Sequence, residues 1–276
     1  MLNLEKLYQK PLTFHRLTGL SPEKFQELST KVEPLFRQAE FKRLNRPDRK
    51  RKIGGGTKRK LSPSQALFML LLYYRTYTNH IFIGMVMGID DSNVSRYCRV
   101  VKPLLAGIFK IPERRIDMNE QGILELIIDA TEQETERRKG SGYSGKKKRN
   151  TIKTQIIVTS KGKIKALSKS VKGNIHDKKL YDQTRAYSII KVKRRADLGY
   201  LGTSCHTPLR KPRNGNLSVS QKLSNAMFNK ERVVVEHTIA TLKQYRILTH
   251  RFRNNLKTYN LIIKNIAGLV NFECAQ

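Results

Sequence analysis

The sequence predicts an α/β protein in which an all-helical N-terminal region precedes a mixed β-sheet with flanking helices. From Ser21 to Phe36 and again from Ser62 to about Lys102, apolar residues recur at three- and four-residue steps, the spacing of amphipathic helices. After Pro112, apolar runs and alternating segments follow in the order strand, strand, strand, helix, strand, helix. We therefore expect two domains, residues 1–110 and residues 111–276.

Capping residues mark the first helices of the N-terminal region. Ser21 is the expected N-cap of a helix that runs to Phe36. Ser62 and Gln65 have the spacing of a capping box and begin a strongly apolar helix that ends near Tyr77. The N-terminal region is therefore expected to be helical on both sides of a basic segment.

The region 61–108 has the pattern of a helix-turn-helix. A short helix over 79–87 ends at Gly88, and Asp90 caps a further helix that runs to about Lys102. When two helices are joined by a tight turn that contains glycine, the second can enter the major groove of DNA. Helical hairpins also occur in proteins that do not bind DNA, so the local pattern leaves both interpretations open.

The helix that begins after Asp90 has two different faces, and Pro103 is expected to end or kink it. The residues expected to pack inward are Val94, Tyr97, Cys98 and Val101. The residues expected to be exposed, where they could contact bases or phosphates, are Ser92, Asn93, Ser95, Arg96 and Arg99.

Two segments concentrate positive charge. Residues 42–60 hold ten Lys or Arg and a glycine triplet without apolar periodicity, which predicts a mobile arm that binds nucleic acid. Residues 137–153 hold eight Lys or Arg around Gly140 and Gly142, which predicts a loop that grips phosphates. A solvated loop without a partner is the alternative for each segment.

The overall charge narrows the class of partner. The chain has 276 residues, with 55 Lys and Arg against 22 Asp and Glu, so its formal charge is +33. This charge predicts a polyanionic partner, most commonly nucleic acid. A membrane surface is the rival partner, but the longest apolar run, residues 66–74, is too short to span a bilayer and the N-terminus lacks the apolar core of a signal peptide. We therefore expect a cytoplasmic, nucleoid-associated protein.

The second domain is expected to contain four strands and two helices. Strands are expected at residues 122–131, 151–160 and 163–171, followed by a helix at 177–188, a strand within 188–200 and a long helix at 229–252. The first three strands are expected to form a meander. An RNA-binding protein would be expected to carry aromatic stacking motifs on such strands, which this sequence lacks.

Three acidic residues stand out in this basic domain. Asp129 ends the apolar run LELII, where an unpaired charge would cost several kcal/mol. Asp197 follows the fourth strand and opens the turn DLGYLG, and Glu236 lies among valines of the long helix, where an unpartnered glutamate would be poorly placed. The alternatives are that Asp129 caps a turn after its strand and that Asp197 is a plain turn former.

Three such carboxylates suit Mg²⁺ or Mn²⁺. A pair of these ions can activate a nucleophile and stabilise the leaving oxygen in an in-line displacement at phosphorus, which fits a DNA substrate. Arg232 lies four residues before Glu236 and Lys243 seven residues after it, so all three fall on one helix face. This spacing fits an ion-pair ladder or a metal ligand flanked by groups that hold phosphates.

Five ordered blocks of the sequence resemble the DDE transposases of bacterial insertion sequences, in the group related to PIF/Harbinger transposases (insertion-sequence family five type). The resemblance covers roughly residues 61–272. The blocks are IIDAT with Asp129, YSGKKKRNTIKTQIIV, GNIHD, ADLGYLG with Asp197, and VEHTIATLKQYRIL with Glu236. Five blocks in order are much more specific than any one of them.

The resemblance implies a ribonuclease-H-like fold with a mixed five-stranded sheet, whose fifth strand would fall near residues 199–207. It implies that Asp129, Asp197 and Glu236 are catalytic residues that hold two Mg²⁺ or Mn²⁺ ions. It also implies a homodimer or higher oligomer that binds the inverted-repeat ends of a mobile element, cleaves them and transfers the freed 3′ ends to target DNA.

The family often carries a Tyr, Arg, Glu, Lys signature around the glutamate. Arg232, Glu236 and Lys243 resemble its last three members, whereas Asn229 stands where the tyrosine would fall. By the same resemblance Lys146, Lys147 and the pair His176 and Asp177 are expected DNA contacts or supports, with Asp177 a weaker candidate for the metal site. Two alternatives stay open: a metal-dependent endonuclease without joining activity, and an inactive or domesticated DNA-binding protein.

Overall fold

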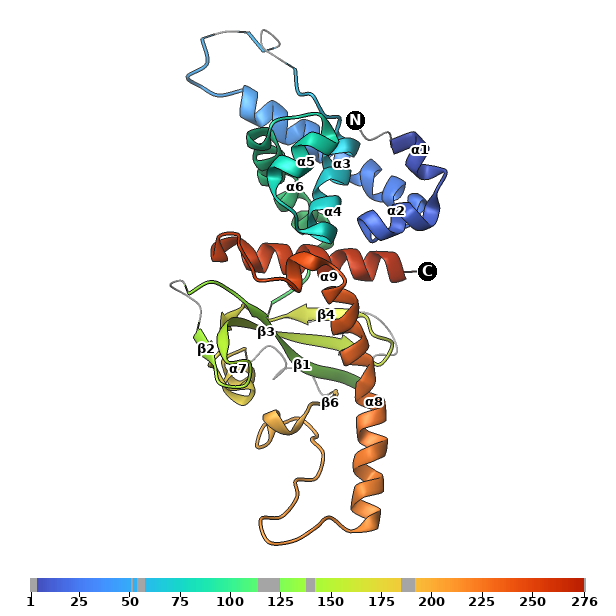
Figure 1. Cartoon of the computed structure of the whole chain (residues 1–276), viewed down its shortest axis with the longest axis vertical. Helices are drawn as coiled ribbons and strands as arrows, with labels where there is room; N and C mark the ends of the chain where they lie inside the picture. The colour runs from blue at the N-terminus through green and yellow to red at the C-terminus, as the bar shows by residue number, and fades with distance from the viewer. Residues whose placement is uncertain are drawn as a thin grey trace. The chain divides into compact units, whose positions relative to one another are not determined.

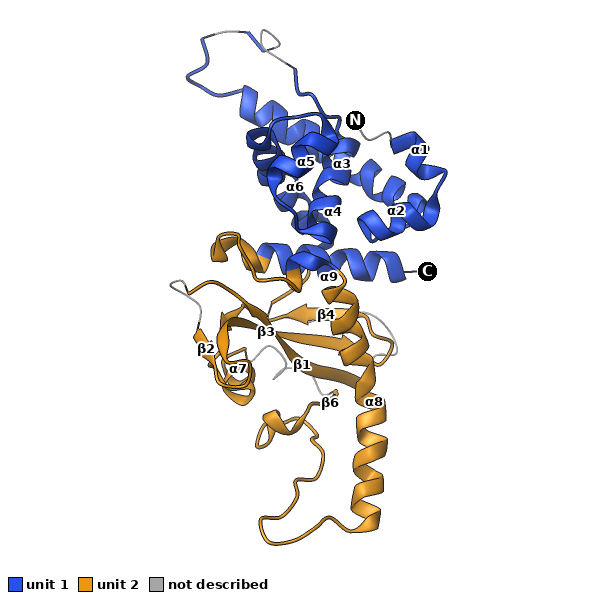
Figure 2. Ribbon diagram, viewed as in Figure 1, with its two compact units in different colours: residues 1–110, 245–247, 261–276 blue, residues 111–244, 248–260 orange. Residues whose placement is uncertain are grey.

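A computed structural model describes residues 4–50, 52–53, 58–113, 125–137, 142–184 and 192–275 (Figure 1). The chain forms two compact units (Figure 2). Unit 1 comprises residues 1–110, 245–247 and 261–276, and unit 2 comprises residues 111–244 and 248–260. The C-terminal segment 261–276, which we expected in the second domain, belongs instead to the first unit.

Unit 1 is helical, as the sequence predicts. Its helices are α1 (Leu4–Tyr8), α2 (Pro11–Thr18), α3 (Pro22–Leu44), α4 (Pro63–Thr76), α5 (His80–Met87), α6 (Asp91–Phe109) and most of α9 (Tyr259–Cys274). Helix α4 packs against α2, α3 and α6, and every residue from Ala66 to Tyr74 is buried. A helix that is apolar on all sides is therefore the centre of the unit.

Two helices are longer than the sequence predicts. Helix α3 continues past Phe36 to Leu44, so the predicted basic arm begins with helical residues. Helix α6 continues through Pro103 to Phe109, whereas we expected it to end or kink near Lys102. Its apolar face continues beyond the proline, where Leu105 is fully buried, and this packing outweighs the one backbone hydrogen bond that a proline removes.

Helices α5 and α6 form the predicted helix-turn-helix. Helix α5 is capped by the side chain of Asn79 and ends at Gly88, which has the positive φ of 68° that glycine adopts without strain. The residues of α6 expected to pack inward are all buried, namely Val94, Tyr97, Cys98 and Val101. The sequence pattern therefore identified both helices and the buried face of the second.

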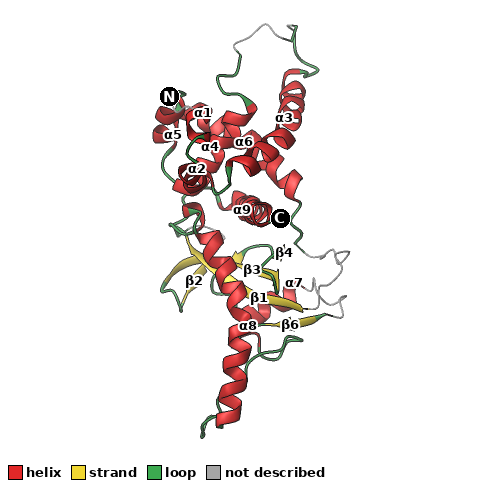
Figure 3. Cartoon of the chain, turned by 90° about the vertical axis from the view of Figure 1, so that its right-hand side faces the viewer, coloured by secondary structure: helices red, strands yellow, loops and turns green. Residues whose placement is uncertain are grey.

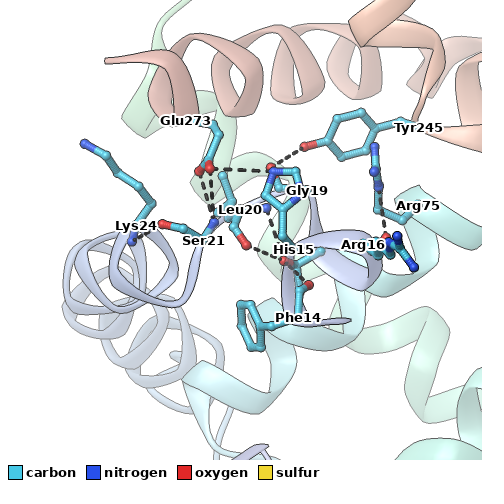
Figure 4. Close-up of polar contacts among 11 residues, drawn as sticks. Phe14, His15, Arg16, Gly19, Leu20, Ser21, Lys24, Arg75, Tyr245 and Glu273 are labelled. Atoms are coloured by element: carbon cyan, nitrogen blue, oxygen red, sulfur yellow. Dashed lines mark hydrogen bonds and ion pairs between the residues drawn. The ribbon is translucent and has the colours of Figure 1, made fainter. Parts of the chain in front are cut away.

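Helix α9 completes the core of unit 1. Asn265 is fully buried and its amide donates to the Tyr74 hydroxyl (3.1 Å) and to the Lys102 carbonyl (2.9 Å). Glu273 accepts a hydrogen bond from the Ser21 backbone at the start of α3 (Figure 4). The end of the chain is thus bound to elements far from it in the sequence. None of the described helices is long and apolar enough to cross a membrane.

Gly19 ends α2 at a position that accepts no side chain. Its φ is +79°, and a β-carbon there would stand 2.2 Å from the hydroxyl oxygen of Tyr245, whose ring is buried (Figure 4). We expect Gly19→Ala to lower the free energy of unfolding by at least about 2 kcal/mol, because the left-handed backbone and the clash both oppose it.

Gly107→Ala is the matched control for this substitution. Gly107 lies in α6 and a β-carbon there would meet nothing within 4 Å. Urea unfolding followed by circular dichroism should show Gly107→Ala to be as stable as the wild type or up to about 1 kcal/mol more stable. Equal stability of the two alanine variants would contradict our account of Gly19.

The described residues of unit 2 form a mixed sheet of six strands, whereas five were expected. The strands are β1 (Glu125–Glu134), β2 (Gly142–Ser144), β3 (Arg149–Thr159), β4 (Ile164–Leu167), β5 (Val171–Lys172) and β6 (Lys193–Arg195). The antiparallel pairs β1 with β3 and β3 with β4 form the predicted meander. Strand β6 pairs with the other edge of β1 in parallel, which makes the sheet mixed.

Several strand boundaries differ from the prediction. Residues 142–153 form a hairpin of β2 and β3 instead of a basic loop, since the lysine-rich turn is flanked by residues that pair. Residues 122–124, 138–141 and 185–191, on which parts of the predicted strands, basic loop and helix fall, lie outside the described part of the chain. Near the position expected for a fifth strand, a single parallel bridge joins Arg195 to His206.

Helices cover both faces of this sheet (Figure 3). Tyr181 of α7 (Asp177–Thr184) packs with Leu126 and Ile128, which share one face of β1. Helix α8 (Val219–Lys243) packs against β1 and β3, and its Arg232 contacts Asp129 on the opposite face. Short 3₁₀ helices complete the described elements, namely η1 (Leu198–Tyr200), η2 (Arg246–Leu248) and η3 (Leu256–Thr258).

Candidate active site

Asp129 lies in the middle of β1, opposite Ile156 of β3. The sequence placed it at the end of a strand, but the polar residues that follow, up to Glu134, remain paired with β3. Its Oδ1 accepts a hydrogen bond from the backbone of Ala130 (2.7 Å). Burial raises the pKa of Asp129 to about 6. A turn-capping role is therefore excluded, because the residue is not in a turn.

Asp197 lies just after β6 and begins the 3₁₀ helix η1. It opens the predicted turn, and its Oδ1 accepts a hydrogen bond from the Gly199 backbone (2.9 Å). Because Ile127 pairs with Arg195 in the parallel ladder, continuing this register brings Asp197 level with Asp129. Asp197 therefore lies near Asp129 although it is past the end of β6, and the repulsion between the two carboxylates adds to the rise in the pKa of Asp129.

Asp177, the first residue of α7, brings another carboxylate close to Asp197. Its Oδ2 and the Oδ1 of Asp197 each lie 3.0 Å from the point where a β-carbon on Gly199 would stand. Its Oδ1 binds the ammonium of Lys153 (2.9 Å), which is nine-tenths buried and also lies 3.3 Å from Glu132. The sequence assigned Lys153 only to the basic segment 137–153 and gave no role to Glu132; the missed signal was a lysine at a buried position of an apolar strand.

Glu236 is placed differently from the sequence-based expectation. It is not packed among valines, because the buried positions of the second half of α8 are Arg232, Val235, Thr238 and Leu242. The side chain of Glu236 is 58% exposed, and its Oε1 lies 3.9 Å from the guanidinium of Arg232. The same guanidinium nitrogen lies 3.6 Å from Asp129. Arg232 therefore links the strand carboxylate to the helix carboxylate.

Two of the lysines predicted to bind DNA lie near these carboxylates. The pKa of Lys243 is lowered, mainly by partial burial and also by Lys147, while Asp129 and Glu132 act against this effect. These influences place Lys243 within electrostatic range of Lys147 and of Asp129. Lys146 is exposed in the turn between β2 and β3, and His176 is exposed just before α7.

The carboxylates of this site suit a divalent metal ion, since partly buried carboxylates of like charge are stabilised by a cation. Asp129, with its raised pKa beside Asp197 and Asp177, is the observation that supports this fit. Across the described residues, no three His, Cys, Asp or Glu side chains are gathered closely enough to hold one ion together. Arg232 lies between Asp129 and Glu236. Of the three predicted metal ligands, Glu236 is therefore the one that does not lie beside the other two.

The exposed face of α6 carries the other predicted DNA contacts. Arg96 and Arg99 are exposed, and Asn93 is half-buried. Asn93 donates to Asp90 (3.3 Å) and accepts from Arg96 (3.2 Å). This chain of hydrogen bonds orients Arg96 along the helix. The buried residues of α6 thus fix its orientation in the unit, and its polar residues face outward.

Comparison with known families identifies the class of protein that these two sites define. Residues 128–271 match the family described as DDE superfamily endonuclease. Residues 59–111 match the family described as helix-turn-helix of DDE superfamily endonuclease. No solved structure matches the chain. The protein is therefore a metal-dependent, DNA-cleaving enzyme with a DNA-binding helix-turn-helix.

One relative makes the family more specific. The chain is 31% identical over 274 residues to the protein named "Probable transposase for insertion sequence element IS702" of Microchaete diplosiphon, covering 95% of this chain and 94% of that protein. The chain belongs to the DDE transposases of bacterial insertion sequences. It is a transposase that binds and cleaves DNA, as the five sequence blocks predicted.

Proposed function

We propose that Asp129, Asp197 and Glu236 are the catalytic carboxylates of this transposase and that they hold two Mg²⁺ or Mn²⁺ ions. The observation that carries the proposal is the position of Asp197 just after β6, beside Asp129 on the parallel neighbour β1, at a place where burial and like charge raise the pKa of Asp129. Such ions would activate the attacking hydroxyl and stabilise the leaving oxygen at phosphorus.

The arrangement of elements supports a ribonuclease-H-like domain. Strands β1, β3 and β4 are antiparallel neighbours, β6 is parallel to β1, and helices cover both faces. The first aspartate lies on the first strand, the second follows β6, and the glutamate lies on a later helix. This is the order that the family resemblance implies for the three acids.

Glu236 can join the two aspartates without a change in the fold. Its side chain is 58% exposed, so it can change rotamer at little cost. Arg232 is held at the same place by Asp129 and keeps the two acids from repelling each other while no cation is bound. In our proposal Arg232 thus positions Asp129 and Glu236, whereas Lys243 and Lys147 bind the phosphates of the DNA that enters the site.

For the whole protein, we infer that the exposed face of α6 binds the inverted-repeat ends of the mobile element. Unit 2 then cleaves these ends and transfers the freed 3′ ends to target DNA. Two ends must be held together for this reaction, so we infer a dimer or a higher oligomer on DNA. The observation that supports end recognition is the exposure of Arg96 and Arg99 on the second helix of the helix-turn-helix.

The test uses labelled DNA from the flanks of the protein's own gene together with a supercoiled target plasmid. We expect cleavage at the element ends and joined product with Mg²⁺ or Mn²⁺, and neither product when the metal is chelated. Cleavage without joined product would favour an endonuclease without joining activity. Binding without cleavage under either metal would contradict the proposed carboxylate set and favour an inactive or domesticated protein.

A further inference from the structure

Unit 1 contains a basic hollow beside the exposed face of α6. Its volume is about 610 Å³. It is bounded by α6, by the end of α3 and by the short segment 58–60 that precedes α4. The residues that line it are Arg43, Lys58, Arg59, Lys60, Asn93, Arg96, Tyr97, Arg99 and Val100. Six of these nine residues are cations, so the hollow suits an anion.

Most of these cations are not neutralised by the protein itself. No ion pair joins Lys58, Lys60, Arg96 or Arg99 to any acid among the described residues. All four are exposed. Four unpaired cations around one hollow repel one another, and a polyanion would relieve this repulsion. A chain of phosphates, spaced along a backbone, matches such an arrangement better than a single small anion does.

Arg59 differs from its neighbours because it is bound to the protein. Its guanidinium donates to Glu40 of α3 at 2.6 Å and pairs with the same carboxylate at 2.5 Å. The guanidinium carbon also lies 5.3 Å from the centre of the Phe36 ring and 5.1 Å from that of Tyr97. Arg59 is thereby attached to both α3 and α6.

Two further contacts hold the segment around Arg59 against α3 and α6, where it lines the hollow. The backbone N–H of Leu61 donates to the Tyr97 hydroxyl (2.9 Å). Glu40 also binds Arg43 (2.5 Å), so one carboxylate holds an arginine on each side. Glu40 is the acid that fixes the segment preceding α4 against the helix-turn-helix. Lys58 and Lys60 flank Arg59 in the sequence, so the ion pair of Arg59 with Glu40 also holds these two lysines beside α6.

We propose that the hollow binds the phosphodiester backbone of double-stranded DNA beside the groove that α6 enters, and that Glu40 is the positioning residue that orders its lysines. The proposal rests on DNA binding by the helix-turn-helix and adds a second surface to it. Glu40 and Arg59 hold the segment in place before DNA arrives, so binding does not have to order it. Lys58 and Lys60 then contact phosphates directly.

Glu40→Gln is a test for which two explanations predict opposite changes in DNA affinity. If only overall charge mattered, removing an acid from a DNA-binding surface would tighten binding. Our proposal predicts about tenfold weaker binding, because Arg59 loses its partner and the segment must be ordered by the DNA. Glu33→Gln is the matched control, since Glu33 lies on the same helix, pairs with Arg37 and does not line the hollow.

The affinities are measured by fluorescence anisotropy with the full chain and a duplex, in a chelator and over a range of salt concentrations. Without metal ions the result does not depend on the catalytic carboxylates, so it is independent of their proposed role. We expect Glu33→Gln to bind within about twofold of the wild type, since it changes only a solvated charge. A Glu40→Gln protein that binds as tightly as Glu33→Gln, with the wild-type unfolding midpoint, would falsify the proposal.

If Glu40→Gln fails to fold, a double variant still tests whether the hollow binds the DNA backbone. Lys58→Gln with Lys60→Gln changes only exposed side chains. We expect it to weaken binding to all duplex sequences alike and to make the slope of log affinity against log salt shallower by about two, one for each lost phosphate contact. An unchanged slope would show that these lysines do not contact the backbone and would overturn the proposal.

Discussion

Asp129→Asn is expected to abolish DNA cleavage while leaving DNA binding intact. The substitution keeps the shape of the side chain and removes the charge that a metal ion needs, so the several kcal/mol that such an ion contributes to the transition state are lost. This corresponds to a fall in the cleavage rate of at least about a thousandfold. The measurement is single-turnover cleavage of labelled element ends at saturating protein concentration.

The folded state should tolerate this substitution. Burial, with repulsion from Asp197 and Asp177 added to it, raises the pKa of Asp129 to about 6, so the charge opposes folding at neutral pH in the absence of metal. The asparagine variant should therefore unfold at no lower a temperature than the wild type when metal is chelated. Asp182→Asn is the control, because Asp182 is an exposed residue of α7. Wild-type cleavage by Asp129→Asn, or an equal loss in Asp182→Asn, would overturn the assignment of Asp129.

Removal of residues 261–276 is expected to prevent the N-terminal unit from folding, although these residues are distant from it in the sequence. The deletion removes four large aliphatic side chains that are fully buried, those of Ile262, Ile263, Ile266 and Leu269. Each contributes about 1.5–3 kcal/mol, so their sum is comparable with the whole stability of a typical domain. The deletion also removes Asn265, the partner of the buried Tyr74 hydroxyl.

The expected result is a loss of DNA binding in anisotropy measurements and rapid proteolysis of residues 1–110. The control is the deletion of residues 275–276, which lie beyond α9 and should leave binding unchanged. A graded version is Ile266→Ala, which should lower the free energy of unfolding by about 2–5 kcal/mol. If the protein without residues 261–276 binds DNA as tightly as the full chain, α9 is not an essential part of the unit.

The local signals in the sequence were sufficient for the helix-turn-helix and for the order of the acids. Ser62 with Gln65 forms the predicted capping box, and Gly88 ends α5 as expected. These features depend on contacts between residues a few positions apart, so a short stretch of sequence contains all of the information. The same holds for Asp197, whose turn is formed by hydrogen bonds within three residues.

The errors arose where contacts between distant residues decide the outcome. Asp129 was expected at the end of a strand because polar residues follow it, but pairing with β3 continues the strand. Glu236 was expected to be buried because valines surround it in the sequence, but the helix face that meets the sheet passes through Val235 and Thr238 instead. Which face of α8 meets the sheet depends on the whole packing of unit 2, which periodicity alone does not specify.

The sequence by itself determined the family of this protein, its basic character, its helix-turn-helix and the identity of its candidate catalytic acids. Only the tertiary structure decided that the C-terminal helix belongs to the N-terminal unit, that Lys153 holds Asp177 beside Asp197, and that Glu40 fixes Arg59 against α6. The reason is physical: propensity, capping and motif spacing act over a few residues, whereas burial and ion pairing act between segments that meet only when the chain has folded.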